Sequence, residues 1–207
     1  MMHMTTPPDP KGGNALWRDG WYRFARVLRS PNAGERPAHA PIDLVVLHSI
    51  SLPPGRYGGD EVLQLFTNTL DWSAHPYFES IRGMTVSAHF FIRRTGALWQ
   101  FVSCDARAWH AGESCYRGRD NCNDDSIGIE LEGLEGDTFE DAQYETLVAL
   151  CAALAQKYPV KYIAGHEHIA PGRKQDPGGG FQWAFLQRSL GWKTQCFPAG
   201  AVRSSSA

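Results

Sequence analysis

The sequence predicts a single α/β domain in which helices flank a central mixed β-sheet. The chain has 207 residues, of which 43% are hydrophobic, and this suffices for one core of ordinary size. Segments with strand and helix character follow one another as strand, helix, two strands, strand, helix, strand and helix, which is not a regular series of parallel strand–helix–strand units. No repeat or linker interrupts the middle of the chain. We therefore expect a disordered N-terminal tail at 1–13, one domain at 14–192 and a C-terminal tail at 193–207.

The first two elements follow from apolar spacing. Residues 42–52 (IDLVVLHSISL) form a short β-branched apolar run that ends at the Pro-Pro-Gly turn of 53–55, so they predict a buried central strand. Residues 60–70 (DEVLQLFTNTL) carry apolar side chains at helical spacing, and Asp60 is a candidate N-cap.

The next elements are three strands. Residues 86–94 and 97–103 are apolar segments joined by the turn residues Thr-Gly, which predicts a β-hairpin. Residues 125–133 (DSIGIELEG) alternate apolar with other side chains and end in glycine, as expected of another strand.

The last third of the chain is predicted to hold two helices and a strand. Residues 137–158 carry the clearest helical pattern, with Thr138 and Asp141 as a capping-box-like start. Residues 160–166 (VKYIAGH) read as a short strand, and 181–190 as a final helix.

Composition excludes several classes of protein. The net charge of −2 gives no reason to expect nucleic acid or an anionic membrane surface as a partner. No stretch approaches the roughly 20 apolar residues of a membrane-spanning helix, and the N-terminus lacks a signal-peptide pattern. The five cysteines are odd in number and without CxxC spacing, so reduced thiols are expected rather than a disulfide scaffold. Together these features favour a cytoplasmic protein.

Titratable groups are concentrated in residues 165–179 (GHEHIAPGRKQDPGG). The spacing does not fit the HExxH motif of a helical zinc protease, and Pro171 ends any helix soon after the histidines. His166 closes the predicted strand, and the loop that follows can turn back to bring Asp176 near it. One imidazole and one carboxylate make half of a catalytic zinc site, which usually has three protein ligands and a water.

The third ligand should lie at the end of a neighbouring strand. His48 closes the apolar run DLVVLH and is one candidate, while His168, His89 and His110 are its rivals. A strand-end histidine is more often a satisfied structural residue than a ligand, and spacing alone does not choose among these side chains.

Two further groups suit hydrolytic chemistry. Lys174 lies two residues before Asp176, where its ammonium could stabilise an oxyanion, although most lysines are simply solvated. Glu130 lies in the strand predicted at 125–133, on the face opposite its isoleucines, where a carboxylate is costly unless it faces a cleft. Beside a metal it would be a natural general base, and Glu132 on the same face is its competitor.

A family resemblance bears on these alternatives. The segments VVLHSISLPPG, VSAHFFIRR, RAWHAG, CNDDSIGIELEG, FEDAQYETL and GHEHIAPGRKQDPG together resemble the zinc-dependent N-acetylmuramoyl-L-alanine amidases of the type-2 amidase and peptidoglycan-recognition superfamily. The resemblance covers about residues 16–190 and is closest to the cytoplasmic 1,6-anhydro-muropeptide amidases of cell-wall recycling. It implies a central mixed sheet flanked by helices, with Zn²⁺ in a groove at one sheet face.

The resemblance also implies roles for five residues. His48, His166 and Asp176 match the zinc ligands of the family, Glu130 matches its general base, and Lys174 matches the residue that stabilises the transition state. The three rival histidines, His89, His110 and His168, fall outside the ligand set.

The implied activity is hydrolysis of the amide between the lactyl group of (1,6-anhydro-)N-acetylmuramic acid and L-alanine of the stem peptide, in muropeptide recycling. The partner is then a small-molecule substrate. One alternative is an amidase that acts on intact peptidoglycan, which would normally carry an export signal or a wall-binding module. Another is a non-catalytic peptidoglycan-binding module, which would typically lack a zinc ligand.

Overall fold

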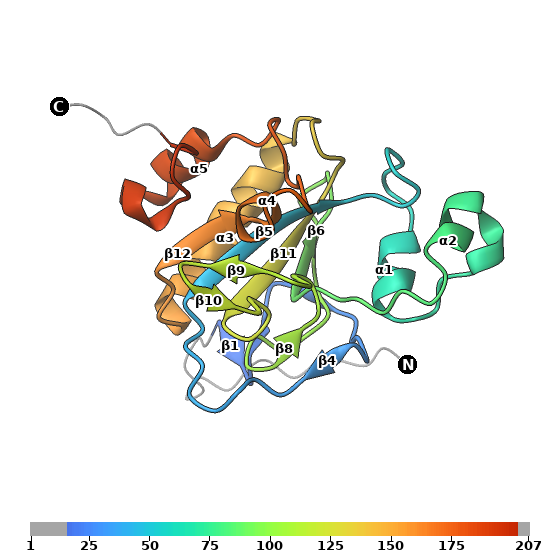
Figure 1. The fold of residues 1–207 in the computed structure, drawn as a ribbon, viewed down its shortest axis with the longest axis horizontal. Helices are drawn as coiled ribbons and strands as arrows, with labels where there is room; N and C mark the ends of the chain where they lie inside the picture. Colours follow the sequence, from blue (N-terminus) through green and yellow to red (C-terminus); the bar gives the residue numbers. More distant parts are fainter. Residues whose placement is uncertain (1–15, 203–207) are drawn as a thin grey trace, which may run out of the picture.

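The core of the protein is a six-stranded mixed sheet. The computed structural model describes residues 16–202, so the N-terminal tail predicted at 1–13 lies outside the described residues. The strand order is β12-β5-β11-β6-β7-β3 (Figure 1). The strands are β3 (Arg26–Val27), β5 (Leu44–Ile50), β6 (Phe90–Ile92), β7 (Leu98–Gln100), β11 (Ser126–Glu132) and β12 (Tyr162–Gly165). All neighbours are parallel except the β6–β7 hairpin, which confirms the predicted mixed sheet.

Helices lie around this sheet, with α3 and α5 on the side of β12 and with α1 and α2 on the side of β6 (Figure 1). Their bounds are α1 (Glu61–Phe66), α2 (Pro76–Ser80), α3 (Asp141–Lys157), α4 (His166–Ile169), α5 (Trp183–Leu190), η1 (Trp72–Ala74) and η2 (Thr194–Cys196). Within residues 16–202, no helix combines the length and the apolarity needed to cross a bilayer.

Three short two-stranded sheets were not predicted from the sequence. They pair β1 (Trp17–Arg18) with β2 (Trp21–Tyr22), β4 (Ala33–Gly34) with β8 (Arg107–Ala108), and β9 (Cys115–Tyr116) with β10 (Arg119–Asp120). Pairs of two residues carry no periodic signal, so their formation depends on long-range contacts.

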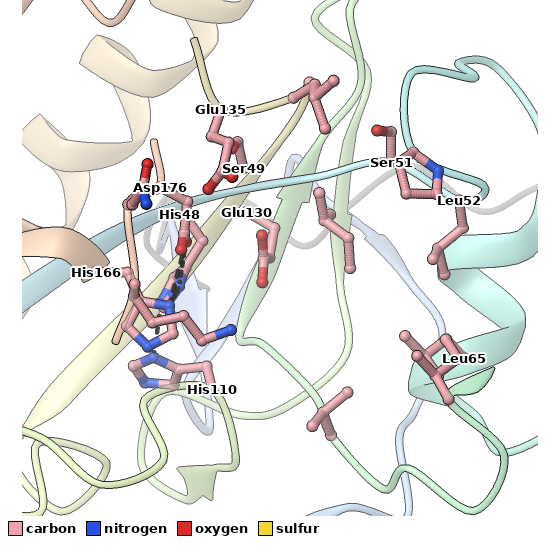
Figure 2. A pocket seen from close by; sticks show the side chains of 18 of the residues that line it. His48, Ser49, Ser51, Leu52, Leu65, His110, Glu130, Glu135, His166 and Asp176 are labelled. Carbon is pink, nitrogen blue, oxygen red and sulfur yellow. Dashed lines mark hydrogen bonds and ion pairs between the residues drawn. The ribbon is translucent and has the colours of Figure 1, made fainter. Parts of the chain in front are cut away.

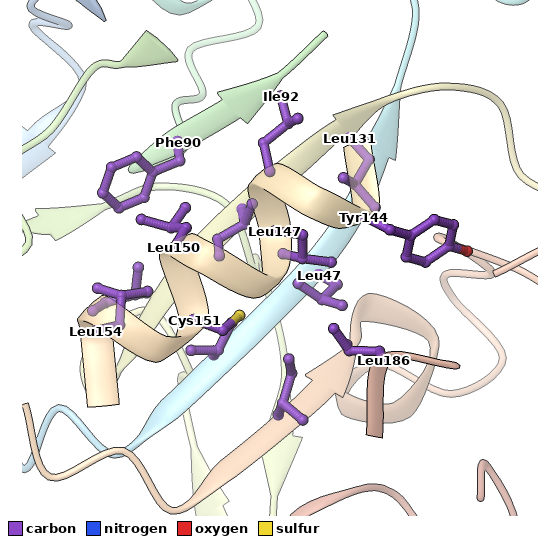
Figure 3. Packing of buried hydrophobic residues seen from close by; sticks show 14 of the residues in the cluster. Leu47, Phe90, Ile92, Leu131, Tyr144, Leu147, Leu150, Cys151, Leu154 and Leu186 are labelled. Carbon is purple, nitrogen blue, oxygen red and sulfur yellow. The ribbon is translucent and has the colours of Figure 1, made fainter. Parts of the chain in front are cut away.

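One face of the sheet packs on α3 to form the main core (Figure 3). Since side chains alternate along a strand, every second residue of β5 and β11 points to this face. Val45, Leu47, Ile127 and Ile129 are fully buried there. The apolar stripe of α3 and one residue of α5 meet them, through Leu147, Leu150, Leu154 and Leu186.

The alternate residues of β5 and β11 point to the opposite face. Leu44 and Val46 are buried there with Ala111 and Ala164. His48 follows in the same alternation, and its register partner on β11 is Glu130. The parallel pairing therefore places a histidine and a carboxylate side by side at the carboxyl ends of two central strands.

Of the two predicted helix caps, Asp60 occupies the expected N-cap position without a side-chain capping bond, and the cap predicted at Thr138 is wrong. Asp60 precedes α1 but makes no capping bond, because its Oδ1 accepts a hydrogen bond from the guanidinium of Arg93 at 2.7 Å. Helix α3 begins at Asp141, three residues after Thr138, and Glu140 takes the N-cap position instead. The main-chain N–H of Glu140 is satisfied by Oε1 of Gln143 at 3.0 Å.

The packed part of the chain extends past the boundary expected at residue 192. Phe197 and Val202 are buried in the main core, beyond η2. The first ten residues of the predicted C-terminal tail are therefore described, and part of them belongs to the core.

Candidate metal centre and active site

Three side chains from separate segments converge at one edge of the sheet (Figure 2). His48 lies near the end of β5, His166 follows β12 as the first residue of α4, and Asp176 lies in the loop before α5. Nδ1 of His48 lies 2.9 Å from Nδ1 of His166, and Oδ2 of Asp176 lies 3.2 Å from each of these nitrogens. The structure thus brings together the three side chains that the family resemblance implies as metal ligands.

Local hydrogen bonds bring Asp176 back to His166. After α4 the chain turns at Ala170, whose carbonyl accepts the main-chain N–H groups of Arg173 and Lys174 at 3.1 and 3.0 Å. The carbonyl of Asp176 then accepts the N–H of Glu167 at 2.9 Å. These bonds close the loop that was expected to bring Asp176 back near His166.

The three donor atoms fit a metal ion. A tetrahedral zinc centre with bonds of about 2.0–2.1 Å separates its ligand atoms by about 3.3 Å, close to the observed separations. Nε2 of His166 contacts the carbonyl oxygen of Ala111 at 3.0 Å. Because a carbonyl can only accept, Nε2 carries the proton and Nδ1 presents a lone pair to the centre. A cation would resolve the crowding of these lone pairs with the Asp176 carboxylate.

Electrostatics keep the centre in the protonation state that a metal requires. Burial, and then the unfavourable interaction with the neighbouring imidazole of His166, lower the pKa of His48 to about 4. Burial alone would raise the pKa of Asp176, but the adjacent imidazoles of His166 and His48 outweigh it and hold this pKa well below its ordinary value. A neutral imidazole and an ionised carboxylate are the ligand forms that bind divalent cations.

Glu130 faces the same space as the three ligands. It is buried, and its Oε2 has no hydrogen-bond partner among the described residues. Burial, followed by the negative charge of Asp176, raises the pKa of Glu130 well above its usual value, whereas the charge of Lys174 opposes this rise. A buried carboxyl group with a raised pKa is typical of a general acid–base residue.

Lys174 lines the same cleft, and its charge acts on both His48 and Glu130. The cleft has a volume of about 570 Å³. Its floor is the metal centre, and Leu65, Phe66 and Ile81 from the α1–α2 region form part of its apolar wall. The site therefore combines a polar reaction centre with a wall that can receive the apolar parts of a substrate.

Glu132, the competitor of Glu130, is engaged elsewhere. Its Oε1 accepts the main-chain N–H of Gly58 at 2.6 Å, and its Oε2 accepts that of Arg94 at 2.9 Å. Through these two bonds the carboxylate links the loops that contain Gly58 and Arg94 to the end of β11. Glu132 does not line the cleft.

The rival histidines also have other partners. Nδ1 of His168 accepts the N–H of Gly165 at 3.0 Å, and Nδ1 of His89 accepts that of Gly128 at 3.0 Å. His110 contacts Nε2 of His48 through its Nδ1 at 2.9 Å, on the side away from the other two ligands. The supporting carbonyl of Ala111 was not predicted, because a main-chain acceptor has no residue-type signature.

Comparison with known proteins agrees with this geometry. Residues 38–179 match the family model described as N-acetylmuramoyl-L-alanine amidase. The chain is 51% identical over 171 residues to the 1,6-anhydro-N-acetylmuramyl-L-alanine amidase AmpD of Citrobacter freundii. The aligned region covers 82% of this chain and 91% of that protein.

Two solved structures are also similar. A crystal structure of a selenomethionine derivative of AmpD superposes with a TM-score of 0.83 at 48% identity, covering 85% of this chain and 99% of that one. A crystal structure of AmpDh3 from Pseudomonas aeruginosa, in complex with anhydromuramic pentapeptide, superposes with a TM-score of 0.54 at 28% identity, covering 73% of this chain and 61% of that one. From its sequence, fold and site, the chain belongs to the N-acetylmuramoyl-L-alanine amidase family.

Proposed function

We propose that this protein is a zinc-dependent amidase that cleaves the bond between the lactyl group of 1,6-anhydro-N-acetylmuramic acid and L-alanine of the stem peptide. The observation that carries this proposal is the convergence of His48, His166 and Asp176 beside Glu130, whose Oε2 has no hydrogen-bond partner in the described part of the chain. Similarity to AmpD of Citrobacter freundii over most of both chains supports the choice of an anhydromuropeptide as substrate.

The cofactor assignment rests on the donor set. Two imidazole nitrogens and one carboxylate oxygen are the ligands of catalytic zinc sites that keep a further position open. A bound zinc ion would supply Lewis-acid polarisation of the scissile carbonyl and a lowered pKa for a coordinated water.

Two residues of the chain then perform the proton transfers and the charge stabilisation. Glu130 accepts a proton from the attacking water and later donates one to the departing amine of L-alanine. Lys174 places its ammonium where negative charge develops on the former carbonyl oxygen. The raised pKa of Glu130 suits both halves of its role, since the group must gain and lose a proton near neutral pH.

The direct test is mass spectrometry of a pure anhydromuropeptide incubated with the purified protein, with zinc and with a chelator. We expect the intact species to disappear and a free stem peptide to appear only when zinc is present. Intact cell-wall sacculi, incubated in parallel, test whether polymeric peptidoglycan is the preferred substrate instead. An unchanged anhydromuropeptide in the presence of zinc would contradict the proposal.

The proposal includes a cytoplasmic site of action, as the sequence suggests. Fractionation of cells that express the protein at its natural level would test this part separately.

A further inference from the structure

A buried chain of polar groups extends from the metal centre into the protein. Behind His48, its Nε2 lies 2.9 Å from Nδ1 of His110. Nε2 of His110 lies 3.1 Å from Oγ of Ser126, and this hydroxyl in turn contacts the main-chain carbonyl of Cys122. His48, His110 and Ser126 are all buried, so water does not compete for these contacts.

The chemistry of the last group sets the direction of the whole chain. A carbonyl oxygen can only accept, so the hydroxyl of Ser126 donates its one proton to Cys122 and accepts from His110 Nε2. His110 is then left with a bare Nδ1, which accepts the proton on Nε2 of His48. His48 consequently presents an unprotonated Nδ1 toward His166 and Asp176, which is the form that can bind a metal.

The backbone beside His110 performs the same task for the second histidine. Oδ1 of Asn123 accepts the main-chain N–H groups of both His110 and Ala111, each at 2.9 Å. The carbonyl of Ala111 faces Nε2 of His166 at 3.0 Å. One asparagine therefore fixes the dipeptide that contacts the rear nitrogen of both histidine ligands.

The sheet leaves space for this arrangement. A Cβ atom on Gly128 would lie 2.5 Å from Cγ of His110, so the imidazole ring packs directly on the backbone of β11. Ser126 and Glu130 flank this glycine on the same face of the strand. The face of β11 that carries the proposed general base, Glu130, is therefore also the face on which His110 packs.

We propose that His110, Ser126 and Asn123 are positioning residues that hold His48 and His166 in the tautomer required for metal binding. In this proposal they affect catalysis through the ligands and not as reacting groups. This inference rests on the proposed zinc site, and it adds a set of supporting residues to it. Loss of such an outer partner typically weakens metal affinity by about 10–100-fold.

The test compares two substitutions of His110 in the full-length protein. His110→Asn retains an acceptor close to the position of Nδ1, whereas His110→Leu removes it with a side chain of comparable bulk. Zinc affinity is measured by competition with a chromophoric chelator, and the tautomer of His48 by ¹⁵N–¹H correlation spectra of the zinc-free protein. We expect His110→Leu to weaken zinc binding by about 10–100-fold and to give a mixture of His48 tautomers. His110→Asn should lose less than about tenfold and keep a single tautomer.

A purely structural role of His110 predicts a different pattern. Equal losses of affinity in the Asn and Leu variants, or wild-type affinity in a folded Leu variant, would overturn the inference. If His110→Leu does not fold, Ser126→Ala removes only the hydroxyl, and an unchanged His48 tautomer and zinc affinity in that variant would overturn it equally. A wild-type protein that binds no zinc would instead refute the proposed function on which the inference rests.

Discussion

Replacing Gly128 by alanine should damage the metal centre without touching any ligand. The added Cβ would lie 2.5–2.6 Å from three atoms of the His110 ring, so the ring must withdraw by roughly 1 Å to reach an ordinary contact. His110 is buried and held at both ring nitrogens, so this displacement strains its contacts with His48 and Ser126. Overpacking of this kind costs about 1–3 kcal/mol. A loss of about 2 kcal/mol lowers the Tm of a chain of this size by about 4–8 °C.

The matched control is Gly179→Ala, because a Cβ there meets nothing within 4 Å. Thermal unfolding of the zinc-free variants measures the packing cost, and chelator competition measures the effect on the site. We expect Gly128→Ala to lower both Tm and zinc affinity, and Gly179→Ala to leave both close to wild type. Wild-type values for Gly128→Ala would refute the close packing of His110 on β11.

Three further predictions concern the reacting groups. Glu130→Gln should lower amidase turnover by about 10²–10⁴-fold while zinc affinity is kept, as measured by product formation and chelator competition. Lys174→Met should reduce kcat by about 10²–10³-fold, with partial recovery in Lys174→Arg, and equal activity of the Met variant and wild type would exclude its role. For the zinc-free protein, His48 should contribute to the stability measured by urea unfolding a term that rises with pH between about 4 and 6.5. The folded state holds the pKa of His48 near 4, below its ordinary value of 6.5, so the unfolded chain binds more protons in that window. His48→Asn should flatten this slope.

The central elements could be predicted because their signals are local. The apolar run at 42–52 and the alternation at 125–133 identified β5 and β11, and helical spacing identified α3. The position of the Asp60 cap was predicted but its missing capping bond was not, since the Asp60 side chain binds Arg93, a long-range partner that no local pattern reveals.

The candidate site could be predicted only in part. Spacing left four histidines in competition for one position, and the family resemblance, rather than physical reasoning, selected His48. The structure shows what distinguishes them. His89 and His168 accept hydrogen bonds from main-chain N–H groups, so their Nδ1 atoms are already used. The donor is 39 residues away in the sequence for His89 and only three residues away for His168. Only the folded structure reveals that both hydrogen bonds form.

One strand face connects the fold to the proposed chemistry. Along β11, alternate residues point to the cleft side, so Ser126, Gly128 and Glu130 form a single row. The serine anchors His110, the glycine makes room for its ring, and the glutamate lies beside His48 on the neighbouring strand. A shift of one residue in the pairing of β11 with β5 would turn all three toward α3 and remove them from the site. The fully buried isoleucines on the other face resist that shift, because they would then have to leave the main core. The hydrophobic packing of β11 on α3 therefore sets the register that places the proposed general base and the residues that support the proposed metal ligand.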